Sequence, residues 1–583
     1  MVKCNQCLVQ IENMTEEGVF GLEDRDAVRK YALQNAIEYN GKGQSGSVLG
    51  RVLAERKQLR SRVKSLLSLV EKEVTRANSI ACEDGIDEVR KELEGFAPEA
   101  LNRERQKKNE GLRDLPGNTS EVILRFAPNP NGPLSIGHSR GVAINSLYAE
   151  KYQGKIVLRF DDTDTKVKPP LVDAYDWIEE EFEWMSGKAA DVVIRASERM
   201  PIYLQYAEKM LVGDFGYVCE CTAEDFREFR VSKTNCPCRE KSVQQNMEDW
   251  DKMNSGEIGE GGAVVRVKTG MDMSNPALRD WPALRIQHSP HPIVGDMYKV
   301  WPLLDFQSAI EDRLQGVTHI IRGKDLMDST RKQTILYEHF GWDYPEPLYW
   351  GRVKIHEFGG FSTSGMSSSI GSGKFSGWDD PRLPTLRALR RRGFDPGSLA
   401  ELWQEVGLTQ KDISISLKTL ESFNSRIIDA SSERRVFVSK PKSLEIVSKN
   451  VASRVMMARH PDGEIEGFRE WEVGMTVSIQ ESDFVEGKLR LKDFADIIIS
   501  ESSATIESLD RSDDRKIVHW IPEKIALEAI LSVPDGEEIS EIKGVLEDFE
   551  LSEGEVYQLE RVGFARIEKI PENGPVDLLY LHG

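Results

Sequence analysis

Long apolar segments and cysteines are both scarce in this sequence. No run of about 18 apolar residues occurs, so the sequence predicts no membrane span. The first residues, MVKCNQCLVQIENMTEEG, lack the apolar core of a signal peptide. Seven cysteines in 583 residues do not suggest a disulfide scaffold and are typical of a reducing compartment. We therefore expect a cytoplasmic protein with no membrane partner.

Positive charge is also in deficit. The chain has 77 Lys and Arg against 97 Asp and Glu, a net charge of −20. A uniformly acidic surface repels nucleic acid, so any nucleic-acid site must gather its basic residues locally. The segment RALRRRG is one such cluster, with Arg387, Arg390 and Arg391 on a predicted helix. A solvated helix face has the same pattern, so both interpretations stay open.

The length of the chain predicts several domains. Residues 1–118 have apolar residues at helical spacing and end in a polar linker, which predicts a helical N-terminal domain. Strands and helices alternate in residues 119–375, which favours a Rossmann-type parallel sheet, with a Cys- and Gly-rich insertion at about 217–297. Residues 376–428 are helical and basic, and residues 429–583 contain short β-type runs typical of barrels. The predicted fold is a multidomain α/β protein with all-β C-terminal barrels.

The stretch PNPNGPLSIGHSRG, residues 128–141, is a turn between the predicted strand EVILRF and a helix that begins near Gly137. Free backbone N–H groups at a helix N-terminus and the imidazole of His138 suit a phosphate group. An ordinary strand–helix connection with a capping histidine is the alternative.

Charged side chains follow the predicted strands. Arg125 ends the first strand, Asp161 follows the second in RFDDTDTK, and Arg322 ends a later one in VTHIIRG. Open α/β sheets bind ligands at the carboxyl ends of their strands. A carboxylate there can hold an ammonium group, and an arginine can grip a carboxylate. An Asp-rich turn without a ligand is the alternative for Asp161.

Four cysteines form two close pairs separated by a short polar segment: Cys219, Cys221, Cys236 and Cys238. Four thiolates are a tetrahedral ligand set for Zn²⁺, and such a zinc is structural because no coordination position stays open. The C-x-C spacing is tighter than the usual knuckle, and four free buried thiols are the alternative. The Gly/Ser-rich stretch GGFSTSGMSSSIGSGK is predicted to be a mobile loop, either a lid over phosphates or a linker.

Taken together, these segments resemble the archaeal type of glutamyl-tRNA synthetase, a class I aminoacyl-tRNA synthetase with a β-barrel C-terminus like that of glutaminyl-tRNA synthetase. The resemblance depends on RFAPNPNGPLSIGHSRG, RFDDTDTK, VTHIIRGKDLMDSTRKQ, FSTSG and SGWDDPRLPTLRALRRRGF. It runs in order along nearly the whole chain, including the N-terminal helices and the C-terminal strands.

The resemblance implies a glutamate–tRNA ligase. Such an enzyme activates glutamate with ATP and Mg²⁺ to glutamyl-AMP and transfers it to the terminal adenosine of tRNA(Glu), with tRNA(Gln) open as a second substrate. The family's first signature, His-Ile-Gly-His, stands here as SIGH, which places the chemistry at Ser135, Gly137 and His138. The implied ATP contacts are Pro128, Asn129, Pro130, Asn131, Gly132, Pro133, Leu134, Ser135, Ile136, Gly137, His138, Ser362, Thr363 and Ser364.

The resemblance also assigns the glutamate contacts, at Arg125, Asn129, Asp161 and Arg322. The second signature, Lys-Met-Ser-Lys-Ser in the family, falls at residues 362–366, where Ser, Thr and Gly replace its lysines. Lys354 or Lys374 would then supply positive charge.

The implied tRNA contacts are the insertion at the acceptor stem, Arg387, Arg390 and Arg391 at phosphates, and the barrels at the anticodon. Three other functions stay open. They are a glutamine–tRNA ligase, a non-catalytic tRNA-binding relative, and a small-molecule nucleotidyl transferase.

Overall fold

A computed structural model of the chain divides into two compact units, residues 1–110 and residues 111–583. The structure describes the following residues: 20–39, 41–100, 112–358, 361–447, 454–462 and 464–583. Across these ranges, no helix is both long and apolar enough to cross a membrane.

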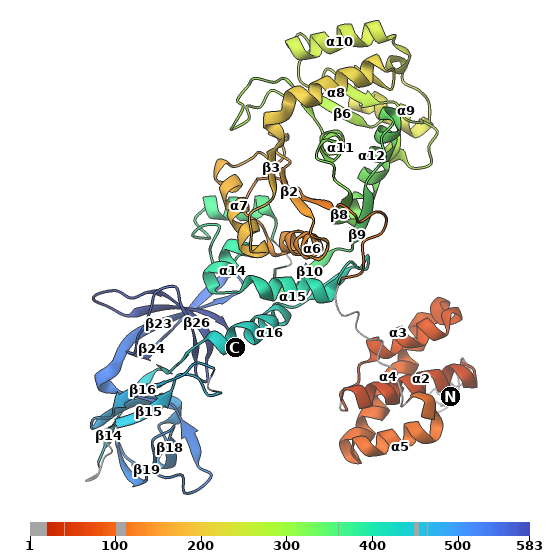
Figure 1. Ribbon diagram of the computed structural model, residues 1–583. Coiled ribbons are helices and arrows are strands. Elements are labelled where there is room, and N and C mark those ends of the chain that lie inside the picture. Colours follow the sequence, from red (N-terminus) through yellow and green to blue (C-terminus); the bar gives the residue numbers. More distant parts are fainter. Residues whose placement is uncertain (1–19, 40, 101–111, 359–360, 448–453, 463) are drawn as a thin grey trace, which may run out of the picture. The chain divides into compact units, whose positions relative to one another are not determined.

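The first unit is a helical bundle, as the sequence predicts (Figure 1). Its helices are α2 (Leu22–Glu38), α3 (Ser45–Glu55), α4 (Val63–Glu83) and α5 (Ile86–Phe96). They bury one apolar core that includes Val28, Val52, Val70 and Leu93. The long helical pattern after residue 45 is interrupted by a 3₁₀ turn over Lys57–Arg62. The segment from residue 56 to 62 has four Lys or Arg and no acid, and like charges on neighbouring turns disfavour a continuous helix.

The first part of the second unit contains a five-stranded arrangement in Rossmann order. Its strands are β1 (Ile123–Phe126), β2 (Lys155–Phe160), β3 (Val192–Arg195), β8 (His319–Gly323) and β9 (Glu346–Trp350). One sheet has the order β1-β2-β3 and the other pairs β8 with β9, all in parallel. The Thr318 N–H donates to the Ile123 carbonyl at 2.9 Å, which joins the two sheets as β3-β2-β1-β8-β9. The apolar runs of the sequence therefore predict β1, β2, β3 and β8 correctly, whereas they do not predict β9.

Helices follow β1, β2, β3 and β8 in the chain: α6 (Ile136–Tyr152), α7 (Val172–Ser186), α8 (Met200–Val212) and α12 (Met327–Phe340). Helix α11 (Leu304–Leu314) precedes β8. An antiparallel sheet lies between β3 and β8 in the chain, in the order β4-β5-β6-β7. Its elements are β4 (Gly216–Cys219), α9 (Ala223–Ser232), α10 (Val243–Ser255), β5 (Val264–Val267), β6 (Pro282–Ile286) and β7 (Val300–Pro302). This sheet is the predicted insertion, with slightly wider bounds.

The region between the sheet and the barrels is mostly helical. Its elements are β10 (Val353–Ile355), α13 (Thr363–Gly371), α14 (Leu386–Arg392), α15 (Pro396–Val406), β11 (Ile413–Ile415) and α16 (Leu417–Ile428). Strands β10 and β11 pair in parallel, which ties the start of this region to the segment between α15 and α16.

Two seven-stranded sheets form the C-terminal part (Figure 1). In the first, β12-β25-β26-β27-β23-β24-β13, the edge strands β12 and β13 are separated in the chain only by Val436. In the second, β21-β18-β19-β20-β14-β17-β22, the edge strands β21 and β22 are separated only by His519. Because the two edges of each sheet are consecutive in the chain, each sheet must curl back on itself into a near-barrel.

The strands of the first near-barrel are β12 (Arg434–Arg435), β13 (Phe437–Ser439), β23 (Ala526–Asp535), β24 (Glu538–Glu547), β25 (Val556–Leu559), β26 (Gly563–Lys569) and β27 (Val576–His582). Those of the second are β14 (Pro441–Ile446), β17 (Thr476–Gln480), β18 (Gly487–Leu491), β19 (Ala495–Ser500), β20 (Ser503–Ser508), β21 (Lys516–Val518) and β22 (Trp520–Pro522). A separate hairpin pairs β15 (Arg454–Ala458) with β16 (Phe468–Glu472).

Candidate active site

Two buried arginines lie at the carboxyl ends of adjacent strands. Arg125 on β1 is 8% exposed and Arg322 on β8 is 6% exposed. Among the described residues, Arg125 donates no hydrogen bond, and its nearest carboxylate contact is Asp312 Oδ1 at 3.4 Å. Burial lowers the pKa of Arg125, and the charges of Arg159 and Arg322 act in the same direction while Asp312 opposes them. The pocket therefore presents desolvated positive charge that an anion would neutralise.

Asp161 directly follows β2 and is held by neighbours that the sequence motifs do not include. Arg159 donates to Asp161 Oδ1 at 2.8 Å and to Asp312 Oδ1 at 2.7 Å. The amide of Gln307 on α11 also donates to Asp161 Oδ1, at 3.0 Å. All these contacts on the Asp161 carboxylate fall on Oδ1. The sequence does contain one signal for Arg159, since an arginine inside the apolar strand KIVLRF must be buried and paired.

Several buried polar atoms around these residues have no hydrogen-bond partner within the described residues. The donors are Nε of Arg125 and Nε of Arg322, and the acceptors are Oδ1 of Asn129, Oε1 of Gln307 and Oδ2 of Asp312. Buried polar groups are nearly always paired, so a cluster of unpaired ones indicates a ligand site. Unpaired guanidinium donors suit a carboxylate, and unpaired oxygen acceptors suit an ammonium group. An amino acid with an acidic side chain offers both.

The first signature begins helix α6, one residue earlier than the sequence predicts. Ser135 is the N-cap: its Oγ accepts from His138 N–H at 3.4 Å, and His138 Nδ1 accepts from Ser135 N–H at 3.2 Å. This reciprocal pair is a capping box with histidine in place of the usual Glu or Gln. Because Nδ1 is an acceptor, the neutral imidazole has its proton on Nε2. Gly137 and His138 are both exposed, which leaves the helix N-terminus open to an anion.

His138 is exposed at the surface, yet many protein atoms lie around it. Burial lowers its pKa, and the positive charge of Lys168 lowers it further. A lowered pKa keeps the ring neutral near pH 7, so His138 can donate a hydrogen bond from Nε2 but adds no positive charge.

The block GWDDPRLPTL serves as the backbone partner of the signature. Ile136 N–H donates to the Pro384 carbonyl at 3.0 Å, and Leu386 N–H donates to the Leu134 carbonyl at 2.8 Å. Ser135 and Thr385 form the antiparallel bridge between these two bonds. The signature turn is therefore held in place by a segment about 250 residues further along the chain.

A buried carboxyl group holds the other side of the same turn. Leu134 N–H donates to Oε2 of Glu181 on α7 at 2.6 Å, and Oε1 of Glu181 has no partner among the described residues. Burial raises the pKa of Glu181 to about 8, although Leu134 and the nearby Arg387 and Arg390 oppose this rise. Glu181 was not among the predicted site residues.

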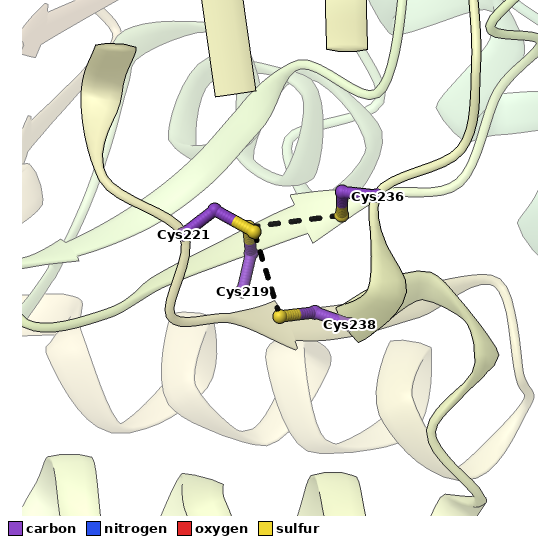
Figure 2. Close-up of side chains that lie close together, drawn as sticks. All are labelled: Cys219, Cys221, Cys236 and Cys238. Carbon is purple, nitrogen blue, oxygen red and sulfur yellow. Dashed lines mark hydrogen bonds between the residues drawn. The ribbon is translucent and has the colours of Figure 1, made fainter. Parts of the chain in front are cut away.

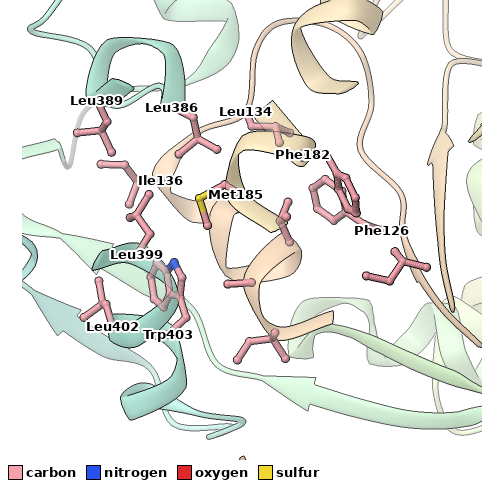
Figure 3. Packing of buried hydrophobic residues seen from close by; sticks show 14 of the residues in the cluster. Phe126, Leu134, Ile136, Phe182, Met185, Leu386, Leu389, Leu399, Leu402 and Trp403 are labelled. Atoms are coloured by element: carbon pink, nitrogen blue, oxygen red, sulfur yellow. The ribbon is translucent and has the colours of Figure 1, made fainter. Parts of the chain in front are cut away.

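The side chains of the signature anchor it to the core. Leu134 and Ile136 lie among Phe182 and Met185 of α7, as Figure 3 shows. The other walls of this cluster come from α14 and α15, with Leu386, Leu389, Leu399, Leu402 and Trp403. Backbone and apolar contacts together fix the turn, which leaves the exposed Gly137–His138 edge for a ligand.

The second signature contacts the first. A Cβ atom at Gly132 would lie 2.9 Å from Thr363 Cγ2 and 3.2 Å from the Trp378 ring, so this close approach requires glycine. The predicted mobile loop is in fact helix α13, with Ser362 as N-cap accepting from Gly365 N–H at 3.1 Å. The expectation of an irregular loop there is wrong, because a serine cap and burial of Met366 outweigh the poor helix propensity of Ser and Gly.

The cations expected to compensate for the missing lysines differ in their surroundings. Lys374 forms an ion pair with Glu537 at 2.6 Å, at the tip of the hairpin β23–β24, so it already has an acidic partner. Lys354 on β10 is exposed and makes no ion pair within the described ranges.

The four cysteines converge, as Figure 2 shows. Their sulfur atoms all lie within 4.8 Å of one another, with 4.0 Å between Cys219 and Cys236 and 3.7 Å between Cys221 and Cys238. Four sulfurs at about 2.3 Å from a tetrahedral zinc lie about 3.8 Å apart, so the cluster fits Zn²⁺ closely.

Comparisons with known proteins agree with this geometry. A family model for the catalytic domain of class I tRNA synthetases (E and Q) matches residues 121–430. The glutamate–tRNA ligase of Methanosarcina mazei is 42% identical over 568 residues, which cover 94% of this chain and 97% of that protein. The enzyme of Archaeoglobus fulgidus is 42% identical over 558 residues, covering 94% and 98%. The chain belongs to the glutamate–tRNA ligase family of class I tRNA synthetases.

A solved glutamate–tRNA synthetase from Elizabethkingia anophelis is also similar. It is 20% identical, and the match covers 53% of this chain and 72% of that one, with a TM-score of 0.40.

For this member of the synthetase family, the three arginines proposed as tRNA contacts have different surroundings. Arg391 donates to both carboxylate oxygens of Glu568 on β26, at 2.9 and 2.6 Å, which ties α14 to the first near-barrel. Arg387 pairs with Glu180 at 3.2 Å. Arg390 is exposed and makes no ion pair in the part of the chain that the structure describes.

Proposed function

We propose that this chain attaches glutamate to tRNA(Glu) in two steps, of which the first consumes ATP. One observation carries the proposal: unpaired buried guanidinium donors and oxygen acceptors lie close together at the strand ends. In this proposal Arg125 and Arg322 hold the side-chain carboxylate, and Asp161 with Asn129 holds the α-ammonium group. Glutamate then lies beside the Pro128–His138 turn, where the phosphates of ATP bind.

The chemistry requires positioning more than covalent catalysis. The α-carboxylate of glutamate attacks the α-phosphorus of ATP, the bond to the bridging oxygen breaks, and pyrophosphate leaves. The 2′-hydroxyl of the terminal adenosine of tRNA then attacks the mixed anhydride and releases AMP. His138 Nε2 and the backbone N–H groups at the start of α6 donate to phosphate oxygens. Mg²⁺ bound to the triphosphate neutralises part of its charge.

Selection of glutamate over glutamine follows from the charge of the pocket. A glutamine amide is neutral, so Arg125 and Arg322 would lack the negative charge that the glutamate carboxylate brings to them. The positive charge of Arg125 and Arg322 favours a glutamate–tRNA ligase over the glutamine-specific alternative. It does not distinguish tRNA(Glu) from tRNA(Gln), and we propose tRNA(Glu) as substrate with tRNA(Gln) as a second one to test.

The test is a charging assay with purified tRNA(Glu) and tRNA(Gln) isoacceptors and labelled glutamate or glutamine. We expect labelled glutamate on tRNA(Glu) and no labelled glutamine on either tRNA. Charging with glutamine would instead support the glutamine–tRNA ligase. No charging, together with tRNA binding, would support the non-catalytic relative.

We also propose a structural zinc ion held by Cys219, Cys221, Cys236 and Cys238. Sulfur separations near those of a tetrahedral site support it. The ion would fix the start of the insertion, whose sheet would contact the acceptor stem, and Arg390 would contact tRNA phosphates. We expect these reactions to take place in the cytoplasm with the rest of translation.

A further inference from the structure

The proposed phosphate site is poor in positive charge. Ser135 is neutral, and the lowered pKa of His138 keeps that ring neutral as well. Residues 362–366, Ser-Thr-Ser-Gly-Met, contain no lysine or arginine. Backbone N–H groups alone leave most of the charge of a triphosphate unbalanced, so a site of this kind needs a cation from another part of the chain.

Most lysines near the strand ends are already paired. Lys166 pairs with Glu260 at 2.7 Å, Lys324 with Asp412 at 2.9 Å, and Lys374 with Glu537 at 2.6 Å. Among the described residues, Lys168 and Lys354 make no ion pair, and both are exposed. These two are the candidates for a free ammonium group.

Lys168 lies on a segment that is hydrogen-bonded to the signature turn. The segment is fixed at one end by Thr165 Oγ1, which donates to the Ser289 carbonyl at 3.0 Å. It is fixed at the other end by Leu171 N–H, which donates to the Pro130 carbonyl at 2.8 Å. Two prolines, at 169 and 170, restrict the backbone between Lys168 and this second anchor. The segment is therefore a short, doubly anchored loop beside the turn.

Two more hydrogen bonds join the signature turn to the start of the segment that carries Lys168. Asp161 N–H donates to the Pro128 carbonyl at 3.0 Å, and the Asn129 amide donates to the Asp161 carbonyl at 2.8 Å. Consistent with this closeness, the charge of Lys168 acts on the His138 ring, where it adds to the effect of burial. No comparable link joins Lys354 to the turn in the part of the chain that the structure describes.

We infer that Lys168 binds the β- and γ-phosphates of ATP and supplies the positive charge that both signatures lack. The inference rests on the proposed function, because it assigns a further residue to the same ATP site. In this role the ammonium group stabilises the charge that builds on the leaving pyrophosphate. Lys168 is thus a catalytic residue for glutamate activation, and not for the transfer to tRNA.

The test compares Lys168→Met, Lys168→Arg and Lys166→Met in ATP–pyrophosphate exchange with glutamate and tRNA present. Losing one charge-assisted contact should lower kcat/KM for ATP roughly ten- to a hundredfold in Lys168→Met, with KM for glutamate little changed. Lys168→Arg should restore most of the loss. Lys166→Met, which removes an exposed, paired lysine two residues away, should stay within about twofold of the original enzyme.

Inhibition by products separates phosphate binding from damage to the fold. In the tRNA charging reaction, pyrophosphate should inhibit Lys168→Met more weakly than the original enzyme. AMP lacks the β- and γ-phosphates, so it should inhibit charging by both proteins equally. If Lys168→Met matches Lys166→Met in exchange and in pyrophosphate inhibition, the inference is wrong while the proposed function stands. If the original enzyme shows no glutamate-dependent exchange, the proposed function itself fails.

Discussion

Leu134 and Glu181 are joined by a 2.6 Å hydrogen bond from the backbone N–H of the first to the side chain of the second. Glu181 is 1% exposed, and it is the side chain that holds the inner face of the signature turn. The charged groups around it are Arg387 and Arg390 on α14 and Glu180 on its own helix.

This carboxyl group should make stability fall with rising pH. Burial raises the pKa of Glu181 to about 8, above its ordinary value of 4.5. Between these values the folded state keeps the proton and the unfolded state loses it, so the free energy of unfolding decreases as pH rises. Glu181→Gln keeps the oxygen acceptor for Leu134 and cannot ionise. We expect its stability relative to the original protein to increase by up to about 1.4 kcal/mol per pH unit in this window.

Denaturant unfolding at pH 5 to 9 measures this difference. Glu180→Gln, an exposed neighbour on α7, is the matched control and should show no comparable slope. Parallel curves for Glu181→Gln and the original protein would show that Glu181 titrates normally.

Ser135 should matter to the fold as a helix cap. Ser135→Ala removes the acceptor for His138 N–H, and we expect the free energy of unfolding to drop by about 1 kcal/mol. Ser135→Asn, with a side chain that caps equally well, should keep most of the stability. Thermal unfolding distinguishes the two variants, and equal losses for Ala and Asn would exclude a capping role.

Arg390 and Arg391 should have different roles: Arg390 contacts tRNA, and Arg391 stabilises the fold. Arg390→Met removes an exposed charge, so tRNA binding should weaken and depend less on salt. Arg391→Met breaks the bidentate pair with Glu568, so the thermal midpoint should fall instead. Filter binding at several salt concentrations, together with calorimetry, checks both. The account would be contradicted if Arg391→Met weakened tRNA binding with unchanged stability.

Zinc should be present at about one ion per chain and should depend on the cysteine cluster. Cys238→Ser should lose most of the metal and unfold several degrees lower, because the ion joins two segments of the insertion. Cys82→Ser is the matched control, since Cys82 is exposed and outside the cluster. Elemental analysis of the purified proteins gives the metal content. A full complement of zinc in Cys238→Ser would refute the four-cysteine site.

Local patterns predict much of this molecule. The apolar runs around Arg125, Asp161 and Arg322 give the strands, and strand ends in a parallel sheet meet at one edge, so these three residues lie at the same edge of the sheet. The paired cysteines converge for a similar reason, because short spacings leave few geometries.

The supporting contacts could not be predicted, because their partners are far apart in the chain. Arg159 meets Asp312 across 153 positions, and Leu134 meets Glu181 across 47. Lys374 is a plausible phosphate ligand by sequence, but Glu537, 163 positions away, neutralises it. Helix α13 could not be predicted from local sequence either, because its Ser- and Gly-rich composition predicts a loop. The helix is stabilised by the burial of Met366, which the sequence does not reveal.

The central claim is that buried guanidinium groups select the side-chain carboxylate of glutamate. Its most direct test is kcat/KM for glutamate and for glutamine in ATP–pyrophosphate exchange with tRNA, for the original enzyme and for Arg322→Met. Arg331→Met, an exposed arginine on α12 paired with Asp328, is the control. The account predicts a strong preference for glutamate that Arg322→Met reduces roughly ten- to a hundredfold, while Arg331→Met keeps it. An unchanged preference in Arg322→Met would contradict it.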